Sequence, residues 1–388
     1  MQIVIVGAGP AGCYTAQLLK HYGVGSSIRI IEEHNEVGKP MSCAGIVGKQ
    51  VFENTLLPLS KASIINQIEG ALIFYGDNNF LIKRPGVAYV IDRERFDKEL
   101  SRGLNVECGK KLVEIKREGS GYVVNTNVDD IYADLVIGAD GPKSKVRKFI
   151  DFDLEEFKGK RREGARIYNN KKYCYVGMQY RIKLDNAISD SDLNITKVHM
   201  CEDIPFFIWI IPENKEIIRL GIIAQNGWQQ LDNFIKKNNI KGEIIGKLAG
   251  IIPLGSASNA YYKNIVLVGD AAGQIKPLTG GGIYYGLKAA EILVECIREG
   301  KLAEYDRRWK RKFGREIKFG LKARQVYEKL NHDELGKIFL VFKKNTKFIE
   351  KIANFENHSV VFKEALKSPK IFIDAGKILG RNIWKLLF

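Results

Sequence analysis

The first residues of the chain have a spacing that can bind phosphate. Gly7, Gly9 and Gly12 form a G-x-G-x-x-G run that follows the apolar segment 2–6 and opens a helical pattern. In such a run the first glycine permits a tight turn, the second admits a pyrophosphate, and the third lets helix and strand pack closely. Amides at the helix N-terminus, that of Cys13 among them, would bind the phosphates. The run predicts a dinucleotide site.

A carboxylate follows at the distance that such a site needs. Glu32 ends the second apolar run, residues 27–31, twenty positions after Gly12. A carboxylate at the end of this strand accepts hydrogen bonds from the adenosine ribose. A glycine turn in an unrelated α/β unit does not require this acid.

Two later segments distinguish FAD from NAD. Asp140 and Asp270 each end an apolar strand, in LVIGADG and VLVGDAA. These segments resemble the paired signatures of the p-hydroxybenzoate hydroxylase-like flavoproteins. The resemblance implies that both bind the cofactor, with Asp270 contacting the FAD ribitol.

A glycine run after Asp270 starts another helix. Amides of Gly281, Gly282 and Ile283 at that N-terminus would face the N1/C2=O edge of the flavin and stabilise its anionic reduced form. A flexible loop is the alternative. Arg93 lies in a D-R-x-x-F-D context, and in the resembling flavoproteins this arginine points toward FAD. It would neutralise the phosphates, or else be a solvated helix arginine.

Residues 38–45, GKPMSCAG, resemble the G-x-P-x-x-C-A-G segment of the geranylgeranyl reductase family. The resemblance to this family covers roughly residues 1–300. In that family the segment lies near the flavin, so Cys43, Ala44 and Gly45 become candidate cofactor contacts and Cys43 a candidate catalytic residue. Alternatively, Cys43 is a small buried residue.

The strand FIWIIP, residues 207–212, is similar to the Y-x-W-x-F-P pattern that lines the lipid cavity of that family. Phe207 replaces the tyrosine and Trp209 matches, which makes both candidate substrate contacts. The strand also resembles the W-x-W-x-I-P signature of flavin-dependent halogenases, or it is a plain core strand. Electron-transfer flavoprotein–quinone oxidoreductases share the fold, but they need a C-terminal four-cysteine cluster, and only Cys296 lies beyond residue 201.

The composition excludes several other classes. The cysteines are scattered without metal-ligand spacing, so no metal site is expected. The chain lacks a run of about 18 apolar residues and leaves no room for a signal peptide before Gln2, which predicts a cytoplasmic protein. Aromatic residues are concentrated in apolar strands rather than between basic residues, which disfavours nucleic-acid binding.

The net charge of +16 is concentrated at one end of the chain. Residues 301–388 hold 22 Lys and Arg against 10 Asp and Glu. A solvated helical surface explains part of this excess, and a membrane surface or a phosphorylated substrate would explain it as an anionic partner. Residues 368–388 have the pattern of a basic amphipathic helix, which either packs on the body or lies in a lipid interface. A peripheral position at the inner face of a membrane is one hypothesis.

The patterns predict an α/β protein, α+β overall, with a Rossmann-like FAD-binding domain, an inserted antiparallel-sheet substrate domain and a C-terminal helical region. Turn residues at 76–79 and 85–86 divide residues 68–90 into short β runs. The predicted domains are an FAD-binding domain (1–67, 88–160 and 255–300), a β-rich substrate domain (68–87 and 161–254) and a basic helical region (301–388).

Together the motifs and the resemblance imply a reductase that saturates double bonds of geranylgeranyl chains in ether-lipid synthesis. Hydride comes from flavin N5, and the proton from Cys43, Tyr284 or a flavin-bound water; Tyr284 is also a candidate substrate contact. The donor is NAD(P)H, ferredoxin or another reductant, and the acceptor a phospholipid, a quinone side chain or a diphosphate. A monooxygenase or halogenase on the same fold is the alternative.

Overall fold

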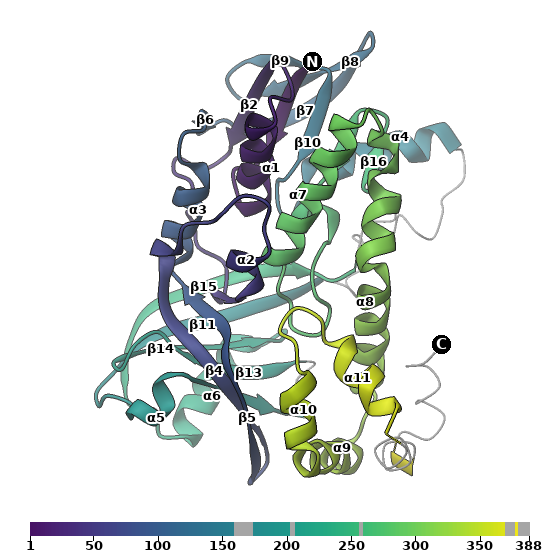
Figure 1. Cartoon of the computed structure of the whole chain (residues 1–388). Coiled ribbons are helices and arrows are strands. Elements are labelled where there is room, and N and C mark those ends of the chain that lie inside the picture. The colour runs from purple at the N-terminus through teal and green to yellow at the C-terminus, as the bar shows by residue number, and fades with distance from the viewer. Residues whose placement is uncertain (159–173, 202–205, 256–258, 369–376, 379–388) are drawn as a thin grey trace.

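The computed structural model describes residues 1–158, 174–201, 206–255, 259–368 and 377–378 (Figure 1). Part of the predicted β-rich segment and most of the predicted amphipathic helix at 368–388 lie outside the described residues.

A six-stranded sheet carries the glycine-rich segments. Its strands run in the order β16 (Tyr261–Tyr262), β17 (Ile265–Leu267), β10 (Leu135–Gly138), β1 (Gln2–Val6), β2 (Ser27–Glu32) and β6 (Val106–Cys108). All pairs are parallel except β16 with β17. Val6 lies between Gly138 and Ile31, so the segments that follow β1, β10 and β2 leave the sheet at the same edge.

Helices and a small sheet cover this parallel sheet. Helix α1 (Pro10–His21) contacts both α3 (Arg93–Ser101) and α7 (Ile283–Arg298). A three-stranded meander of β7 (Leu112–Glu118), β8 (Gly121–Thr126) and β9 (Asp130–Ala133) contacts β1 and β10, and α4 (Lys145–Lys158) lies beside it. The strands are buried on both faces, which explains their almost uninterrupted apolar sequences.

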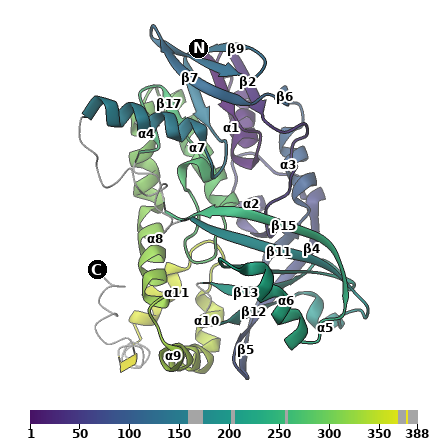
Figure 2. The ribbon, with the colours of Figure 1, turned by 180° about the vertical axis from the view of Figure 1, so that it is seen from behind.

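The second sheet has eight strands and is mostly antiparallel. Its order is β15 (Gly242–Pro253), β11 (Cys174–Leu184), β14 (Ile217–Ile223), β13 (Phe207–Pro212), β12 (Ile195–Met200), β4 (Ile64–Tyr75), β5 (Asn78–Ile91) and β3 (Ile46–Gly48). Strand β12 pairs with β4 in parallel, and this pairing joins the two segments of chain that build the sheet. Figure 2 shows β11 and β15 crossing below α7.

Short helices connect these elements: α2 (Gln50–Glu53), η1 (Lys61–Ser63), α5 (Asp190–Leu193), α6 (Gly227–Lys237), η4 (Gly269–Ala272) and η5 (Leu302–Glu304). The C-terminal region forms α8 (Tyr305–Tyr327), α9 (His332–Lys344), α10 (Thr346–Ile352) and α11 (Ser359–Leu366). It packs against the body, because Leu335 and Phe339 of α9 form a buried cluster with Tyr75 and Phe80 of the β4–β5 hairpin.

The predicted fold class is confirmed, while the predicted domain limits stay a prediction. The expectation of short β runs between residues 68 and 90 was wrong, because β4 and β5 are 12 and 14 residues long. The turn at 76–79 is the hairpin turn. Pro85 and Gly86 fall in an irregularity where the register passes from Gly70 opposite Lys83 to Ile68 opposite Ala88, which accommodates a proline without ending the strand.

Candidate active site

In the glycine turn after β1, Gly7 and Gly12 are tightly packed against backbone atoms, whereas Gly9 borders open space. Gly7 has φ +102°, and a Cβ on it would lie 2.4 Å from the carbonyl oxygen of Ala139. A Cβ on Gly12 would lie 2.1 Å from the carbonyl oxygen of Gly7. Next to Gly9 the corresponding position has no atom within 4 Å. Gly7 and Gly12 therefore allow the backbone to close, while Gly9 leaves space at the N-terminus of α1 that suits an approaching pyrophosphate.

The first turn of α1 presents amides to this space. Gly9 is the N-cap, Pro10 has no amide hydrogen, and the Cys13 amide donates to the Gly9 carbonyl at 3.0 Å. The amides of Ala11 and Gly12 therefore belong to the turn that lacks helical acceptors, and an anion can accept from them. The Cys13 thiol is buried, its Sγ is 3.1 Å from the Ala8 carbonyl, and burial raises its pKa. A phosphate contact by Cys13 stays a prediction.

Glu32 joins the end of β2 to the glycine turn. Its carboxylate accepts from the Ala8 amide at 2.9 Å and from the His34 amide at 3.0 Å, and His34 Nδ1 lies 2.6 Å away. The side chain is 12% exposed, so the carboxylate is oriented but reachable. This is the position expected for a ribose acceptor.

Arg93 links three segments that are distant in the sequence. Its Nε and Nη2 donate to Asp97 at 3.1 and 3.0 Å, and Cys43 lies within electrostatic reach of its guanidinium. Burial raises the pKa of Asp270 to about 6, and the positive charge of Arg93 opposes that rise. Cys43 and Asp270 therefore each lie within electrostatic reach of Arg93, as expected for contacts to one cofactor.

The glycine run after Asp270 packs against that carboxylate. A Cβ on Gly282 would lie 2.7 Å from Asp270 Oδ1, and Gly280 has φ +72°. Gly282 is the N-cap of α7, whose first residue is Ile283. Gly281 lies against Lys276, whose Cε would be 2.8 Å from a Cβ at that position. The run is thus an ordered helix start rather than a flexible loop.

The carboxylate of Asp140 is hydrogen-bonded to residues at the start of α4. Its carboxylate accepts from Ser144 Oγ at 2.6 Å and from the amides of Lys145 and Val146 at 2.7 and 3.2 Å. These bonds cap α4, so the cofactor role of Asp140 stays a prediction.

The two faces of β13 have different surroundings. Trp209 and Ile211 belong to a buried cluster with Ala44, Ile252 and Ile275, which lies toward the glycine-rich segments. Trp209 Nε1 donates to Gln179 at 2.8 Å, and the ring of Phe207 lies 6.1 Å from that of Trp209. The predicted substrate contacts Phe207 and Trp209 therefore belong to the same apolar cluster as Ala44 of the Cys-Ala-Gly segment.

Tyr284 is placed differently. It packs against the core of the parallel sheet rather than the cluster around Trp209, and burial raises its pKa. The structure does not bring Tyr284 together with Phe207 and Trp209 in one cluster, and a substrate contact by Tyr284 stays a prediction.

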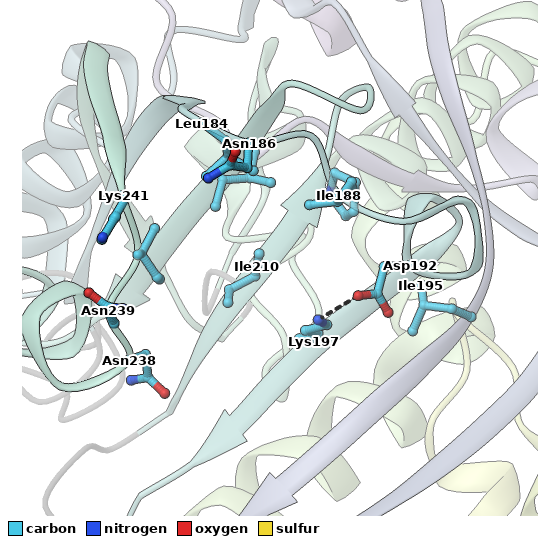
Figure 3. A pocket seen from close by; sticks show the side chains of 13 residues that line it. Leu184, Asn186, Ile188, Asp192, Ile195, Lys197, Ile210, Asn238, Asn239 and Lys241 are labelled. Carbon is cyan, nitrogen blue, oxygen red and sulfur yellow. Dashed lines mark hydrogen bonds and ion pairs between the residues drawn. The ribbon is translucent and has the colours of Figure 1, made fainter.

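A pocket of about 430 Å³ opens on the other face of the second sheet (Figure 3). Ile210, between Trp209 and Ile211, lines it together with Lys197, Asp192 and Lys241, and Lys197 forms an ion pair with Asp192 at 3.1 Å. This pocket contains none of the predicted site residues.

Two buried ion pairs near the site were not predicted from the sequence. Arg219 pairs with Glu213 at 2.6 Å, and Lys276 pairs with Glu356 at 2.9 Å. A single arginine inside the apolar run IIRLGII was a signal for the first pair, because a buried charge needs a partner. Glu356 had no such signal, since it lies in a polar segment.

Among the described residues, no group of three or more His, Cys, Asp and Glu side chains could hold a metal ion. Nor does that part of the chain include a helix long and apolar enough to cross a bilayer.

The parallel sheet, the open glycine turn, the carboxylate of Glu32 at the end of β2 and the returning Asp270 segment define a dinucleotide-binding flavoprotein of the oxidoreductase class. A family model for an NAD(P)-binding Rossmann-like domain matches residues 5–51. An uncharacterised protein of Methanocaldococcus jannaschii is 30% identical over 95% of both chains. Digeranylgeranylglycerophospholipid reductase 1 of Methanococcoides burtonii is 27% identical over 88% of this chain and 87% of its own.

A solved structure of a geranylgeranyl bacteriochlorophyll reductase-like protein from Thermoplasma acidophilum matches with a TM-score of 0.79 and 21% identity, over 97% of this chain and 98% of the other. The chain belongs to the geranylgeranyl reductase family.

Proposed function

We propose that this protein is an FAD-dependent reductase that saturates carbon–carbon double bonds in the polyprenyl chains of a membrane lipid. The observation that carries the proposal is the apolar cluster that contains Trp209 and Ile211 and packs against Ala44, the residue next to Cys43. An apolar wall at the proposed flavin site suits a hydrocarbon chain. The relatives named as digeranylgeranylglycerophospholipid reductases support the same substrate class.

The residues that would hold FAD surround one edge of the parallel sheet. The amides at the start of α1 would bind the pyrophosphate, Glu32 would accept from the ribose and Asp270 from the ribitol, and the Gly282 and Ile283 amides would bind the flavin ring. When bound and reduced, FAD supplies the hydride that one alkene carbon receives. The apolar face of β13 excludes water from that transfer.

A proton must reach the second alkene carbon. Cys43 lies within electrostatic reach of Arg93, and burial keeps the Tyr284 hydroxyl protonated by raising its pKa. These two groups and a water molecule are the candidate proton sources. The electron donor is NAD(P)H, ferredoxin or another external reductant.

A peripheral contact with an anionic membrane surface is part of the proposal. Arg311, Arg315, Lys318 and Lys322 recur along α8, and within the described residues none of them forms an ion pair. Helical spacing places them along one side of α8, which favours anionic lipid. Binding to anionic vesicles that persists after deletion of residues 368–388 would show that the C-terminal segment is not needed for it.

The decisive experiment incubates the dithionite-reduced protein anaerobically with geranylgeranyl phospholipid, geranylgeranyl diphosphate or a polyprenyl quinone. Mass spectrometry should show a gain of two hydrogens per reduced double bond. No gain with any of the three overturns the proposal. NAD(P)H oxidation in air coupled to hydroxylation or halogenation would indicate the alternative chemistry instead.

A further inference from the structure

Arg219 of β14 reaches from the second sheet into the loop that carries Cys43. Its Nε lies 2.6 Å from Glu213, its Nη1 donates to the Ala44 carbonyl at 2.8 Å, and its Nη2 donates to the Ile91 carbonyl at 3.2 Å. The side chain is only 6% exposed. A guanidinium has its donors in a rigid fork, so these three contacts fix the relative positions of their acceptors.

The two carbonyls belong to the segments that carry Cys43 and Arg93. Ala44 follows Cys43 directly, and Ile91 lies two positions before Arg93. The Ile91 amide also donates to the Gly45 carbonyl at 2.8 Å, which joins the two segments. Gly45 has φ +69°, and a Cβ there would collide with Arg219 Nη1. The guanidinium thus occupies the space that a side chain at position 45 would need.

The same arginine adjoins the proposed substrate face. Arg219 is paired with Ile211 across β13 and β14, and Gly221 is paired with Trp209. The Trp209 ring covers Gly221, where a Cβ would lie 2.3 Å from its Cζ2 atom. Arg219 and Gly221 are two residues apart and lie on one face of the strand. A chain that binds against Trp209 therefore contacts the surface that holds Arg219.

We propose that Arg219 is a positioning residue that sets the distance between Cys43 and Arg93 and couples it to the substrate face of β13 and β14. The coupling to the substrate face rests on the proposed function, whereas the positioning of Cys43 does not. Glu213 contributes to this arrangement, because its carboxylate neutralises the charge of the buried Arg219 guanidinium.

Arg181 provides a matched control. It contacts the same carboxylate, with its Nε 2.8 Å from Glu213 Oε2, but its side chain is 42% exposed. None of its hydrogen bonds within the described part of the chain reaches Ala44 or Ile91. Arg181→Gln removes a positive charge from Glu213 without removing a donor from the Cys43 loop.

The test measures alkylation of Cys43 by iodoacetamide in the FAD-loaded protein without substrate, with peptide mapping to separate the other cysteines. We expect Arg219→Gln to change the Cys43 alkylation rate by about tenfold or more, because the Ala44 and Ile91 carbonyls lose a charged donor. The absorption spectrum of bound FAD should shift, and Arg181→Gln should change neither. Arg219→Lys keeps the charge without the fork and should give an intermediate rate.

In the reductase assay, Arg219→Gln should lower kcat about tenfold, with a smaller change in KM. Equal effects of Arg219→Gln and Arg181→Gln on alkylation, or an unchanged Cys43 rate in Arg219→Gln, would overturn the positioning role. If Arg219→Gln does not fold, the Arg219→Lys comparison decides by the same criteria. Wild-type protein without reductase activity would refute the proposed function and leave the alkylation test intact.

Discussion

The Nζ atom of Lys276 lies 2.9 Å from the carboxylate of Glu356, and both side chains are almost fully buried. Lys276 also donates to the Phe355 carbonyl at 2.8 Å, while Glu356 accepts from the Gly48 amide at 3.1 Å. Because Lys276 packs against Gly281, this ion pair ties the segment between α10 and α11 to the loop proposed to face the flavin.

Breaking this pair should destabilise the protein strongly. Glu356→Gln leaves the Lys276 charge buried without its counterion, and we expect a loss of about 3–5 kcal/mol in the free energy of unfolding. Urea unfolding of the apoprotein measures it. The double variant Lys276→Met/Glu356→Gln should lose less than the sum of the single losses. Glu364→Gln breaks the exposed pair with Lys367 and should cost less than about 1 kcal/mol. Similar losses for the buried and exposed pairs would contradict this account.

Alanine substitutions at Gly9 and Gly12 should affect different properties, with the first weakening cofactor binding and the second weakening folding. A methyl group at Gly9 enters open space, so Gly9→Ala should leave the apoprotein stable but weaken FAD binding about tenfold or more, or about 1.4 kcal/mol. A methyl group at Gly12 collides with the Gly7 carbonyl, so Gly12→Ala should lower the melting temperature of the apoprotein itself. Flavin fluorescence titration and thermal unfolding test the pair. Unchanged FAD affinity in Gly9→Ala would place the pyrophosphate elsewhere.

Asp270 should make the apoprotein less stable as the pH rises. Burial raises its pKa from 3.8 to about 6, so between these values the folded protein keeps a proton that the unfolded chain loses. The contribution of Asp270 to stability falls across that window by on the order of 3 kcal/mol and no longer changes above it.

Asp270→Asn removes this titration. The stability of the variant relative to wild type should therefore increase from pH 4 to pH 7 in urea unfolding. The exposed carboxylate of Asp190 serves as control, and Asp190→Asn should show no comparable trend. A constant difference between Asp270→Asn and wild type would mean that Asp270 does not titrate in this range.

Adjacent residues of β13 can locate the polyprenyl chain. Trp209 faces the cluster beside Ala44, whereas Ile210 lines the pocket on the opposite face. Trp209→Leu should raise KM for the polyprenyl substrate about fivefold or more through lost apolar contact, and Ile210→Ala should change it less than about twofold. A larger effect at Ile210 would place the chain in the opposite pocket.

Local patterns predicted the nucleotide-binding half of the site, because its parts are short motifs at strand and helix ends. Helix α3 begins at Arg93 with Asp92 as its N-cap, and the Asp92 side chain accepts from the Arg95 amide at 3.1 Å. Helix α7 likewise starts directly after the glycine run. Hydrogen-bond and turn requirements within a few residues determine such features.

The contacts between distant segments could not be predicted in this way. The pairing of β12 with β4 depends on which edge of a sheet is free, and the local sequence of the two strands does not determine it. Arg219, Glu213 and Ala44 meet only once both sheets are in place. Tyr284 packs against the core of the parallel sheet, and its predicted contact with the substrate stays a prediction.

The parallel pairing of β12 with β4 also governs when the protein can fold during synthesis. Strand β4 is complete once residue 75 has been made, but its neighbour β12 ends only at Met200. In the same way, β10 can pair with β17 only after residue Leu267, the last residue of β17, has been made. Both sheets therefore depend on contacts between residues far apart in sequence, which form slowly. A ribosome-bound chain that ends near residue 150 lacks a partner strand for each sheet. It exposes the edge of β4 until translation has passed residue 200 and the edge of β10 until translation has passed residue 267.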